Sequence, residues 1–286
     1  MTPTKRQERR AAGPGGASAP FLRAVRWRRS MRSERSDFPF ALPVLRELDQ
    51  LALNRPITFF VGENGSGKST LLEAIALLCG CVAMGSDDLE RDPTLEAARC
   101  LRAELVAVFG SLRPRTKTFF RAEDAFGFTK RVVREQAYLA ELEREFRDRY
   151  PDGSLAQQLA AGAARGQRSA FDGRYGEQPD ARSHGESFLD LLGQRLVAGG
   201  LYLLDEPETP LSPIRVLALL RLLSQQADAG SQFLIATHSP ILMALPGAEL
   251  LHFDDGGIRP VAWEEVEHVA LTRSFLQCPE RYLRRL

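Results

Sequence analysis

The sequence predicts an α/β fold with a mainly parallel sheet and an inserted helical segment. One observation is the apolar run PITFFV at 56–61, which is followed by a glycine-rich turn and a helical segment from Ser69 to about Leu78. A second is that the alternation returns, with strand-like LYLL at 201–204 and QFLIA at 232–236 on either side of a helix. Strands that alternate with helices favour a parallel sheet. The 286 residues, 44% of them hydrophobic, supply core for one large domain.

The glycine-rich turn predicts a phosphate-binding loop. Residues 62–69 read GENGSGKS and fit the pattern G-x-x-x-x-G-K-[ST]. In such a loop the backbone N–H groups face phosphate oxygens, Lys68 reaches the β- and γ-phosphates and Ser69 ligates magnesium. The flanking strand and helix favour this function over a chance glycine turn. The expected nucleotide-binding residues are Gly62, Glu63, Asn64, Gly65, Ser66, Gly67, Lys68, Ser69 and Thr70.

Two acidic residues end the LYLL strand. Successive side chains of a strand point to opposite faces, so Asp205 and Glu206 are expected to differ in direction. Asp205 is expected to hold magnesium and Glu206 to act as general base on the attacking water. Alternatively, the two acids only mark where a strand reaches solvent. Their combination with a phosphate loop favours the catalytic interpretation.

The remaining elements are expected from apolar spacing and from capping residues. The expected domain bounds are a disordered basic tail at 1–20, the main domain at 21–260 and a helical extension at 261–286. We expect a first strand at 21–27, a helix from Pro213 to about Ala227 capped by Ser212, and a terminal helix at 272–283. Between the first strand and the second helix we expect a mostly helical insert at about 81–182. This insert is expected to contain a helix at 131–150 and a mobile loop at 161–182.

Composition limits the cellular setting. Residues 1–36 hold ten Lys or Arg and two Asp or Glu. This basic segment could attract nucleic acid or anionic lipid. Alternatively, it is a disordered, solvated tail, or it lies ahead of the true start codon. The four cysteines match neither a disulfide framework nor a zinc pattern. No apolar run approaches the length of a membrane span, and no secretory signal is recognisable. We therefore expect a cytoplasmic protein without a transmembrane segment of its own.

Taken together, these motifs resemble the ATP-binding-cassette superfamily over residues 21–255. The signature, usually LSGGQ, corresponds to SHGES at 183–187, which begins 22 residues before Asp205. The acidic strand is followed by EPETPLSP, in which 210–212 occupy the position of the dimer-contacting loop, and then by ATHSP, which contains His238. The pattern FFRAE, SHGESFL, LDEPE, ATHSP and LTRSFLQCPERYL resembles a group of small bacterial predicted AAA/ABC-type ATPases.

The resemblance implies a head-to-tail homodimer with two ATP molecules and Mg²⁺ at its interface. Ser183 and the Gly185 backbone would complete the partner's site, and His238 would bond the γ-phosphate and sense hydrolysis. The family also carries a glutamine before the signature, but residues 51–135 contain none. Glu123 is a candidate for its role, in the segment KTFFRAEDAF. Because SHGES departs from LSGGQ, hydrolysis across the dimer could be slow.

Three functions are compatible with these motifs. The first is a stand-alone cytosolic ATPase that uses ATP-driven dimerisation to act on a partner, related by motif to the DNA-associated RecF and SMC ATPases but without room for their long coiled-coil arms. The second is the ATPase subunit of a membrane importer of the siderophore type, bound to a permease. The third is a nucleotide-dependent switch without turnover.

Overall fold

The computed structural model describes residues 20–28, 37–46, 48–84, 88–175 and 184–284. Seven strands form the main sheet in the order β10-β9-β3-β8-β7-β6-β4, and only β10 runs antiparallel to its neighbour. This arrangement confirms the predicted α/β fold with a mainly parallel sheet. The strands are β3 (Ile57–Gly62), β4 (Val82–Ala83), β6 (Lys117–Arg121), β7 (Leu201–Asp205), β8 (Gln232–Ala236), β9 (Glu249–Asp254) and β10 (Gly257–Pro260).

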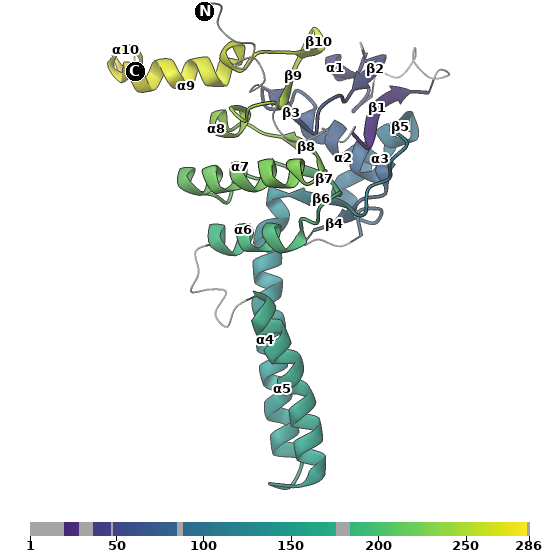
Figure 1. The fold of residues 1–286 in the computed structure, drawn as a ribbon, viewed down its shortest axis with the longest axis vertical. Helices are drawn as coiled ribbons and strands as arrows, with labels where there is room; N and C mark the ends of the chain where they lie inside the picture. Colours follow the sequence, from purple (N-terminus) through teal and green to yellow (C-terminus); the bar gives the residue numbers. More distant parts are fainter. Residues whose placement is uncertain (1–19, 29–36, 47, 85–87, 176–183, 285–286) are drawn as a thin grey trace, which may run out of the picture.

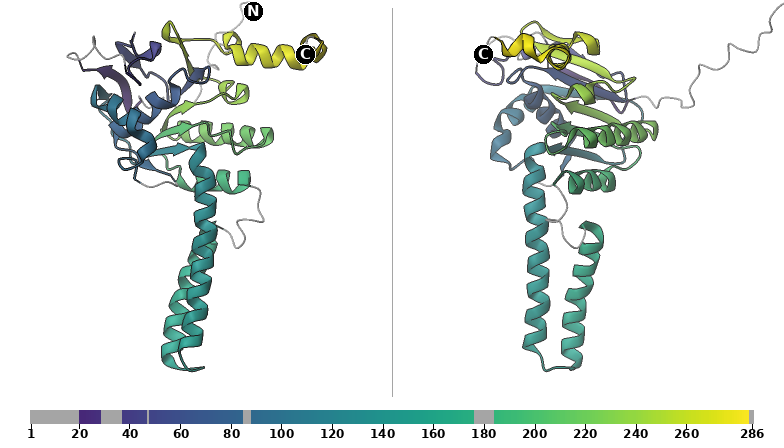
Figure 2. Two further views of the ribbon diagram at one scale, coloured as in Figure 1. Left: turned by 180° about the vertical axis from the view of Figure 1, so that it is seen from behind. Right: turned by 90° about the vertical axis from the view of Figure 1, so that its left-hand side faces the viewer.

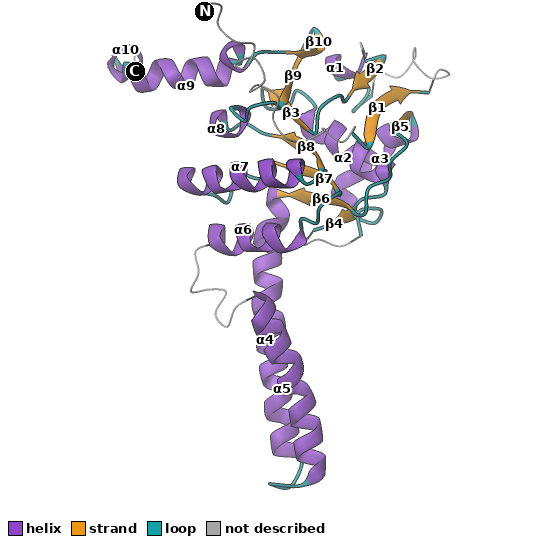
Figure 3. Cartoon of the chain, viewed as in Figure 1, coloured by secondary structure: helices purple, strands orange, loops and turns teal. Residues whose placement is uncertain are grey.

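Helices cover both faces of this sheet (Figure 1, Figure 3). One face carries α2 (Lys68–Cys79) and α3 (Glu96–Ala103), and the other α6 (His184–Arg195), α7 (Pro213–Asp228), α8 (Pro240–Met243) and α9 (Glu267–Gln277). Side chains alternate between the two cores: Phe60 packs with α2, whereas Phe59 and Val61 pack with α7 and α8. Burial on both faces explains why β3 is apolar throughout.

A smaller antiparallel sheet has the order β2-β1-β5. It consists of β1 (Leu22–Trp27), which the sequence predicts, β2 (Gln50–Ala52) and β5 (Leu105–Phe109). The buried Gln232 side chain joins it to the main sheet, because its amide accepts from the Leu22 N–H at 2.9 Å and donates to the Leu22 carbonyl at 2.8 Å. The short helices α1 (Pro43–Arg46) and η1 (Pro93–Leu95) complete this side of the molecule.

A helical hairpin projects from the end of β6. It consists of α4 (Ala122–Arg149) and α5 (Leu155–Tyr175), which lie side by side in each view (Figures 1 and 2). The buried Glu143 joins the two helices, because it pairs with Arg147 at 2.9 Å on its own helix and with Arg165 at 3.1 Å and Arg168 at 3.4 Å on α5.

The structure corrects the expected insert at 81–182. Its first part is not mostly helical, because residues 82–121 contain β4, β5 and β6 in addition to α3. The helix expected at 131–150 begins earlier, at Ala122. The loop expected at 161–182 is helical as far as Tyr175, and the rest lies outside the described residues. Small residues here serve packing: Ala161 and Ala164 are buried in the hairpin, where larger side chains would hold the helices apart.

The C-terminal extension is helical but divided. A turn, η2 (Trp263–Glu265), precedes α9, and α10 (Pro279–Leu283) follows it. The helix expected at 272–283 breaks because Pro279 lacks a backbone N–H and disfavours helical geometry at Cys278, whose φ is −148°. The tail expected at 1–20 lies almost wholly outside the described residues. No helix in the described ranges is both long and apolar enough to span a bilayer.

Candidate functional site

The candidate residues meet at one edge of the main sheet. Strands β3, β8 and β7 are adjacent and parallel, so their carboxyl ends lie together. The glycine loop follows β3, Asp205 ends β7, and His238 follows β8 by two residues. Ligands of open parallel sheets bind at this edge.

Backbone geometry shapes the glycine loop. Gly62 has a φ of 140°, and a Cβ there would lie 2.4 Å from the carbonyl oxygen of Phe253, so no other residue fits. Gly67, with a φ of 94°, leads into α2, whose free N-terminal N–H groups attract anions. Lys68 reaches back over the loop, and its Nζ donates to the carbonyls of Gly62 at 3.0 Å and Glu63 at 2.5 Å. Burial lowers the pKa of Lys68, although the neighbouring carboxylates act to raise it.

The predicted metal-binding pair is in contact. The Ser69 hydroxyl donates to Asp205 Oδ1 at 3.0 Å, which joins the start of α2 to the end of β7. Burial raises the pKa of Asp205 to about 7, although the Ser69 hydrogen bond acts in the opposite direction. A neighbouring cation strongly stabilises the ionised form of a carboxylate that is buried in this way.

Glu206 directly follows the last residue of β7, and its backbone is left-handed and not extended like a strand. Its φ of 48° is the one positive value among the described non-glycine residues, and left-handed geometry costs a residue of this type about 1–2 kcal/mol. The Glu206 carboxylate is 43% exposed, accepts from the Thr209 hydroxyl at 3.3 Å and lies 3.9 Å from His238 Nε2. Burial lowers the pKa of His238, which favours a neutral imidazole.

Glu208 fixes the backbone that carries His238, a role that the sequence did not reveal. Its Oε1 accepts from the Thr237 hydroxyl at 2.6 Å and from the N–H groups of His238 at 2.8 Å and Ser239 at 3.1 Å. Burial raises the pKa of Glu208. The EPET sequence shows an acid at this position, but only the fold brings it against a turn thirty residues away.

We expect Glu208→Ala to destabilise the protein by about 3 kcal/mol, because it leaves buried donors unsatisfied. Urea unfolding of the purified protein measures this change. Glu208→Gln keeps an acceptor oxygen at the same position and should cost about 1 kcal/mol or less. Equal losses in the two variants would contradict the role assigned to the Oε1 acceptor.

A pocket of about 370 Å³ opens beside the loop. This volume lies in the usual range for small-molecule sites. Its lining includes Lys68, Ser69, Glu206 and His238, together with Phe38, whose side chain is 63% exposed. Leu42, Asn64, Gly65, Gly67 and Thr70 line the rest of it. Sequence reasoning missed Phe38, which lies far ahead of the loop in the chain.

Other expected residues are only partly described. Gly185 lies in the first turn of α6, and Ser183 precedes this helix outside the described residues. Glu123 lies in the first turn of α4, and its side chain is outside the described part of the structure. The residue before α4, Arg121, is in register with Asp205 and pairs with Asp92 at 2.5 Å, so the start of the hairpin lies beside the site.

Two family models and a curated relative match parts of this chain. A family model described as an AAA domain matches residues 39–100, and another, described as an AAA domain, putative AbiEii toxin, type IV toxin–antitoxin system, matches residues 187–244. The chain is 30% identical over 199 residues to the cytochrome c biogenesis ATP-binding export protein CcmA of Paramagnetospirillum magneticum. That match covers 68% of this chain and 79% of CcmA.

Matches among the solved structures include an ABC transporter and an Smc head domain. An inward-facing metal-chelate-type ABC transporter matches with a TM-score of 0.41 and 17% identity, covering 86% of this chain and 84% of that chain. The Smc head domain of Pyrococcus furiosus, bound to the C-terminal domain of ScpA, matches with a TM-score of 0.40 and 12% identity, covering 79% of this chain and 95% of that chain. At these values neither likeness indicates a function.

Proposed function

This chain belongs to the ATP-binding-cassette family of P-loop ATPases, and on that premise we propose that it binds ATP with Mg²⁺ and hydrolyses the bond to the γ-phosphate. One observation carries the proposal: the Ser69–Asp205 pair, 3.0 Å apart, adjoins a pocket lined by both Lys68 and Glu206. A phosphate loop alone supports binding, whereas a carboxylate facing the pocket supports hydrolysis.

The residues fit a magnesium ion that is shared with the nucleotide. Mg²⁺ prefers oxygen ligands and usually binds through one or two protein groups, phosphate oxygens and water. Ser69 and Asp205 supply such oxygens. Over the described ranges, no group of three or more His, Cys, Asp or Glu is placed to hold a metal, which fits a site completed by phosphates. The bound ion supplies charge neutralisation at the β- and γ-phosphates.

Each remaining side chain has a distinct part in the proposed step. Lys68 exchanges the Gly62 and Glu63 carbonyls for phosphate oxygens, and the exposed Phe38 ring offers a stacking surface for the base. Glu206 orients water and takes up its proton as the water oxygen bonds to the γ-phosphorus. The bond from that phosphorus to the bridging oxygen breaks, and ADP and phosphate leave. Neutral His238 donates a hydrogen bond to the γ-phosphate.

We infer that the complete site forms between two copies arranged head to tail. Its support is the helix that begins at His184, whose N-terminal N–H groups follow Ser183 and include that of Gly185. Such a helix end suits the γ-phosphate of a partner's ATP.

We propose that the dimer transmits ATP-driven motion to another macromolecule through the hairpin. Its support is that α4 begins directly after β6, whose last residue is in register with Asp205, so the hairpin starts at the catalytic edge. The 30% identity to the CcmA export protein favours a second candidate, the ATPase subunit of a membrane transporter. Affinity purification of Glu206→Gln with ATP separates the two, because a co-purifying permease would contradict stand-alone action.

We expect steady-state phosphate release from the wild type to require both ATP and Mg²⁺, and Lys68→Ala to lower it by at least about 10-fold. The reason is that Lys68 stabilises charge on the transferred phosphoryl group. A malachite-green assay at saturating ATP measures the rate. Arg259→Ala is the matched control, because it removes a cation that is 60% exposed, pairs with Asp254 and does not line the pocket. Equal rates for the wild type and Lys68→Ala would contradict the enzyme proposal.

A further inference from the structure

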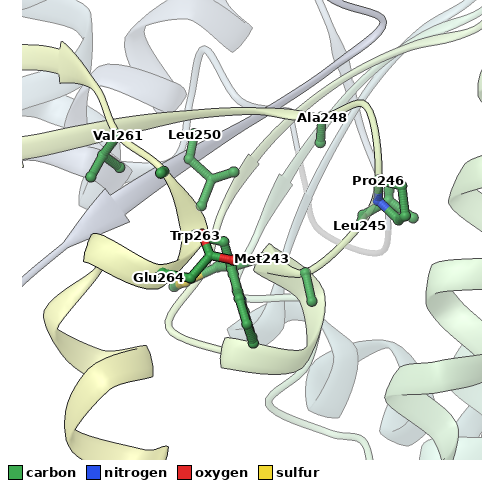
Figure 4. Close-up of a pocket in the computed structure, with 10 residues that line it drawn as sticks. Met243, Leu245, Pro246, Ala248, Leu250, Val261, Trp263 and Glu264 are labelled. Atoms are coloured by element: carbon green, nitrogen blue, oxygen red, sulfur yellow. The ribbon is translucent and has the colours of Figure 1, made fainter.

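The C-terminal extension touches the turn that carries His238 at two points. The Trp263 indole donates to the carbonyl oxygen of Pro240 at 3.0 Å. Five residues later, the His268 ring meets the His238 ring edge to face, with centroids 5.2 Å apart and planes at 72°. Figure 4 shows Trp263 in one pocket with Met243 of α8, between that helix and the start of the extension.

The residues next to His268 are packed in the core. Val266 and Val269, on either side of His268 in the chain, are 1% and 2% exposed in the core that also contains α8. The Arg273 guanidinium lies over the Trp263 ring at 4.9 Å and ties the following turn of α9 to η2. His268 is therefore presented to His238 from a packed helix.

Backbone contacts alone do not orient the His238 ring. Glu208 holds the N–H of His238, but the side chain can still rotate about its own bonds. The Nε2 atom lies 3.9 Å from the Glu206 carboxylate, too far for a hydrogen bond. The edge-to-face contact with His268 is the interaction that limits ring rotation from the side of the C-terminal extension.

We propose that His268 is a positioning residue for the hydrolysis proposed above, holding the His238 imidazole beside Glu206 and toward the phosphate pocket. The inference rests on that proposed function. Through His268, the helix α9, which lies outside the nucleotide pocket, affects the orientation of His238. A motion or partner that shifts α9 would thereby change the rate of hydrolysis.

Variants of His268 test this role by their kinetics. We expect His268→Ala to lower kcat about 5- to 10-fold at nearly unchanged KM, because a misoriented His238 affects the transition state more than ATP binding. His268→Phe keeps an aromatic edge and should restore most of kcat. Leu276→Ala, on the same helix and 72% exposed, is the control and should behave as the wild type.

Imidazole NMR of the protein without nucleotide gives a second readout. The chain has four histidines, and the signal lost in His238→Gln identifies the His238 ring. We expect His268→Ala to shift and broaden that signal, His268→Phe to shift it less and Leu276→Ala to leave it in place. An unmoved signal in His268→Ala, an unchanged kcat, or a Phe variant as slow as the Ala variant would overturn the positioning role.

The two proposals fail differently. If the wild type releases no more phosphate than Lys68→Ala, the hydrolysis is refuted and the positioning role falls with it. If the wild type hydrolyses ATP and His268→Ala does so equally fast, only the positioning role is refuted.

Discussion

We expect Glu206→Gln to lower the rate of phosphate release by about 10²–10³-fold, because the amide cannot take a proton from the attacking water. ATP binding should persist, since Lys68, Ser69 and Asp205 are unchanged. Glutamine fills the same space and keeps one acceptor for the Thr209 hydroxyl. Phosphate release measures turnover, and isothermal titration with Mg-ATP measures binding in the same preparation.

The same variant tests the head-to-tail dimer. With ATP and Mg²⁺, Glu206→Gln should elute at twice the 31.8 kDa mass of one chain, because hydrolysis no longer separates the copies. Adding Lys68→Ala should return it to the mass of a monomer. A Glu206→Gln protein that binds ATP tightly and stays monomeric would contradict the composite site.

Backbone strain supplies an independent check on Glu206. Its φ of 48° is unfavourable for glutamate but not for glycine. Glu206→Gly should therefore raise the free energy of unfolding by about 1 kcal/mol, although it removes the proposed base. Glu206→Gln keeps the strain and should unfold like the wild type. A stabilised but inactive glycine variant would show that the fold tolerates this strain for a function and not for packing.

Local patterns predicted the elements that form the catalytic edge. The run PITFFV and the glycine loop correspond to β3 and the start of α2, and LYLLDE corresponds to β7 with its two acids. These features are readable because apolar runs and glycine spacing act within a few residues. Strands β5 and β6 were missed because LVAVF and KTFFR are short runs within a charged region, and their pairing partners lie far away in the chain.

Contacts between distant segments could not be predicted from the sequence. Glu208 meets the His238 turn, and His268 meets the His238 ring, only after β7, β8 and α9 are packed. The polarity of a single residue does not reveal such a partner. The hairpin shows the same limit, because the sequence between 161 and 175 has the composition of a loop and becomes a helix through packing against α4.

We expect Asp205→Asn to stabilise the protein without nucleotide while lowering Mg-ATP turnover by about 100-fold or more. Burial raises the pKa of Asp205 to about 7, so the folded state binds this proton more tightly than the unfolded state, whose carboxyl titrates near 4. The contribution of the group to stability is thus fully present below about pH 4 and is lost as the pH rises to 7. Asparagine resembles the protonated acid at every pH and removes this loss.

The gain should therefore be near zero at pH 4 and about 2 kcal/mol at pH 8, after allowance for the partial exposure of the carboxylate. Urea unfolding at both pH values measures it, and Asp190→Asn on α6, an exposed aspartate, is the control. Addition of Mg-ATP should reverse the order at pH 8, because the ion stabilises an ionised Asp205 and not an amide. A variant that is less stable than the wild type at pH 8 without nucleotide, or one that Mg-ATP stabilises equally, would show that Asp205 serves the fold and not the metal.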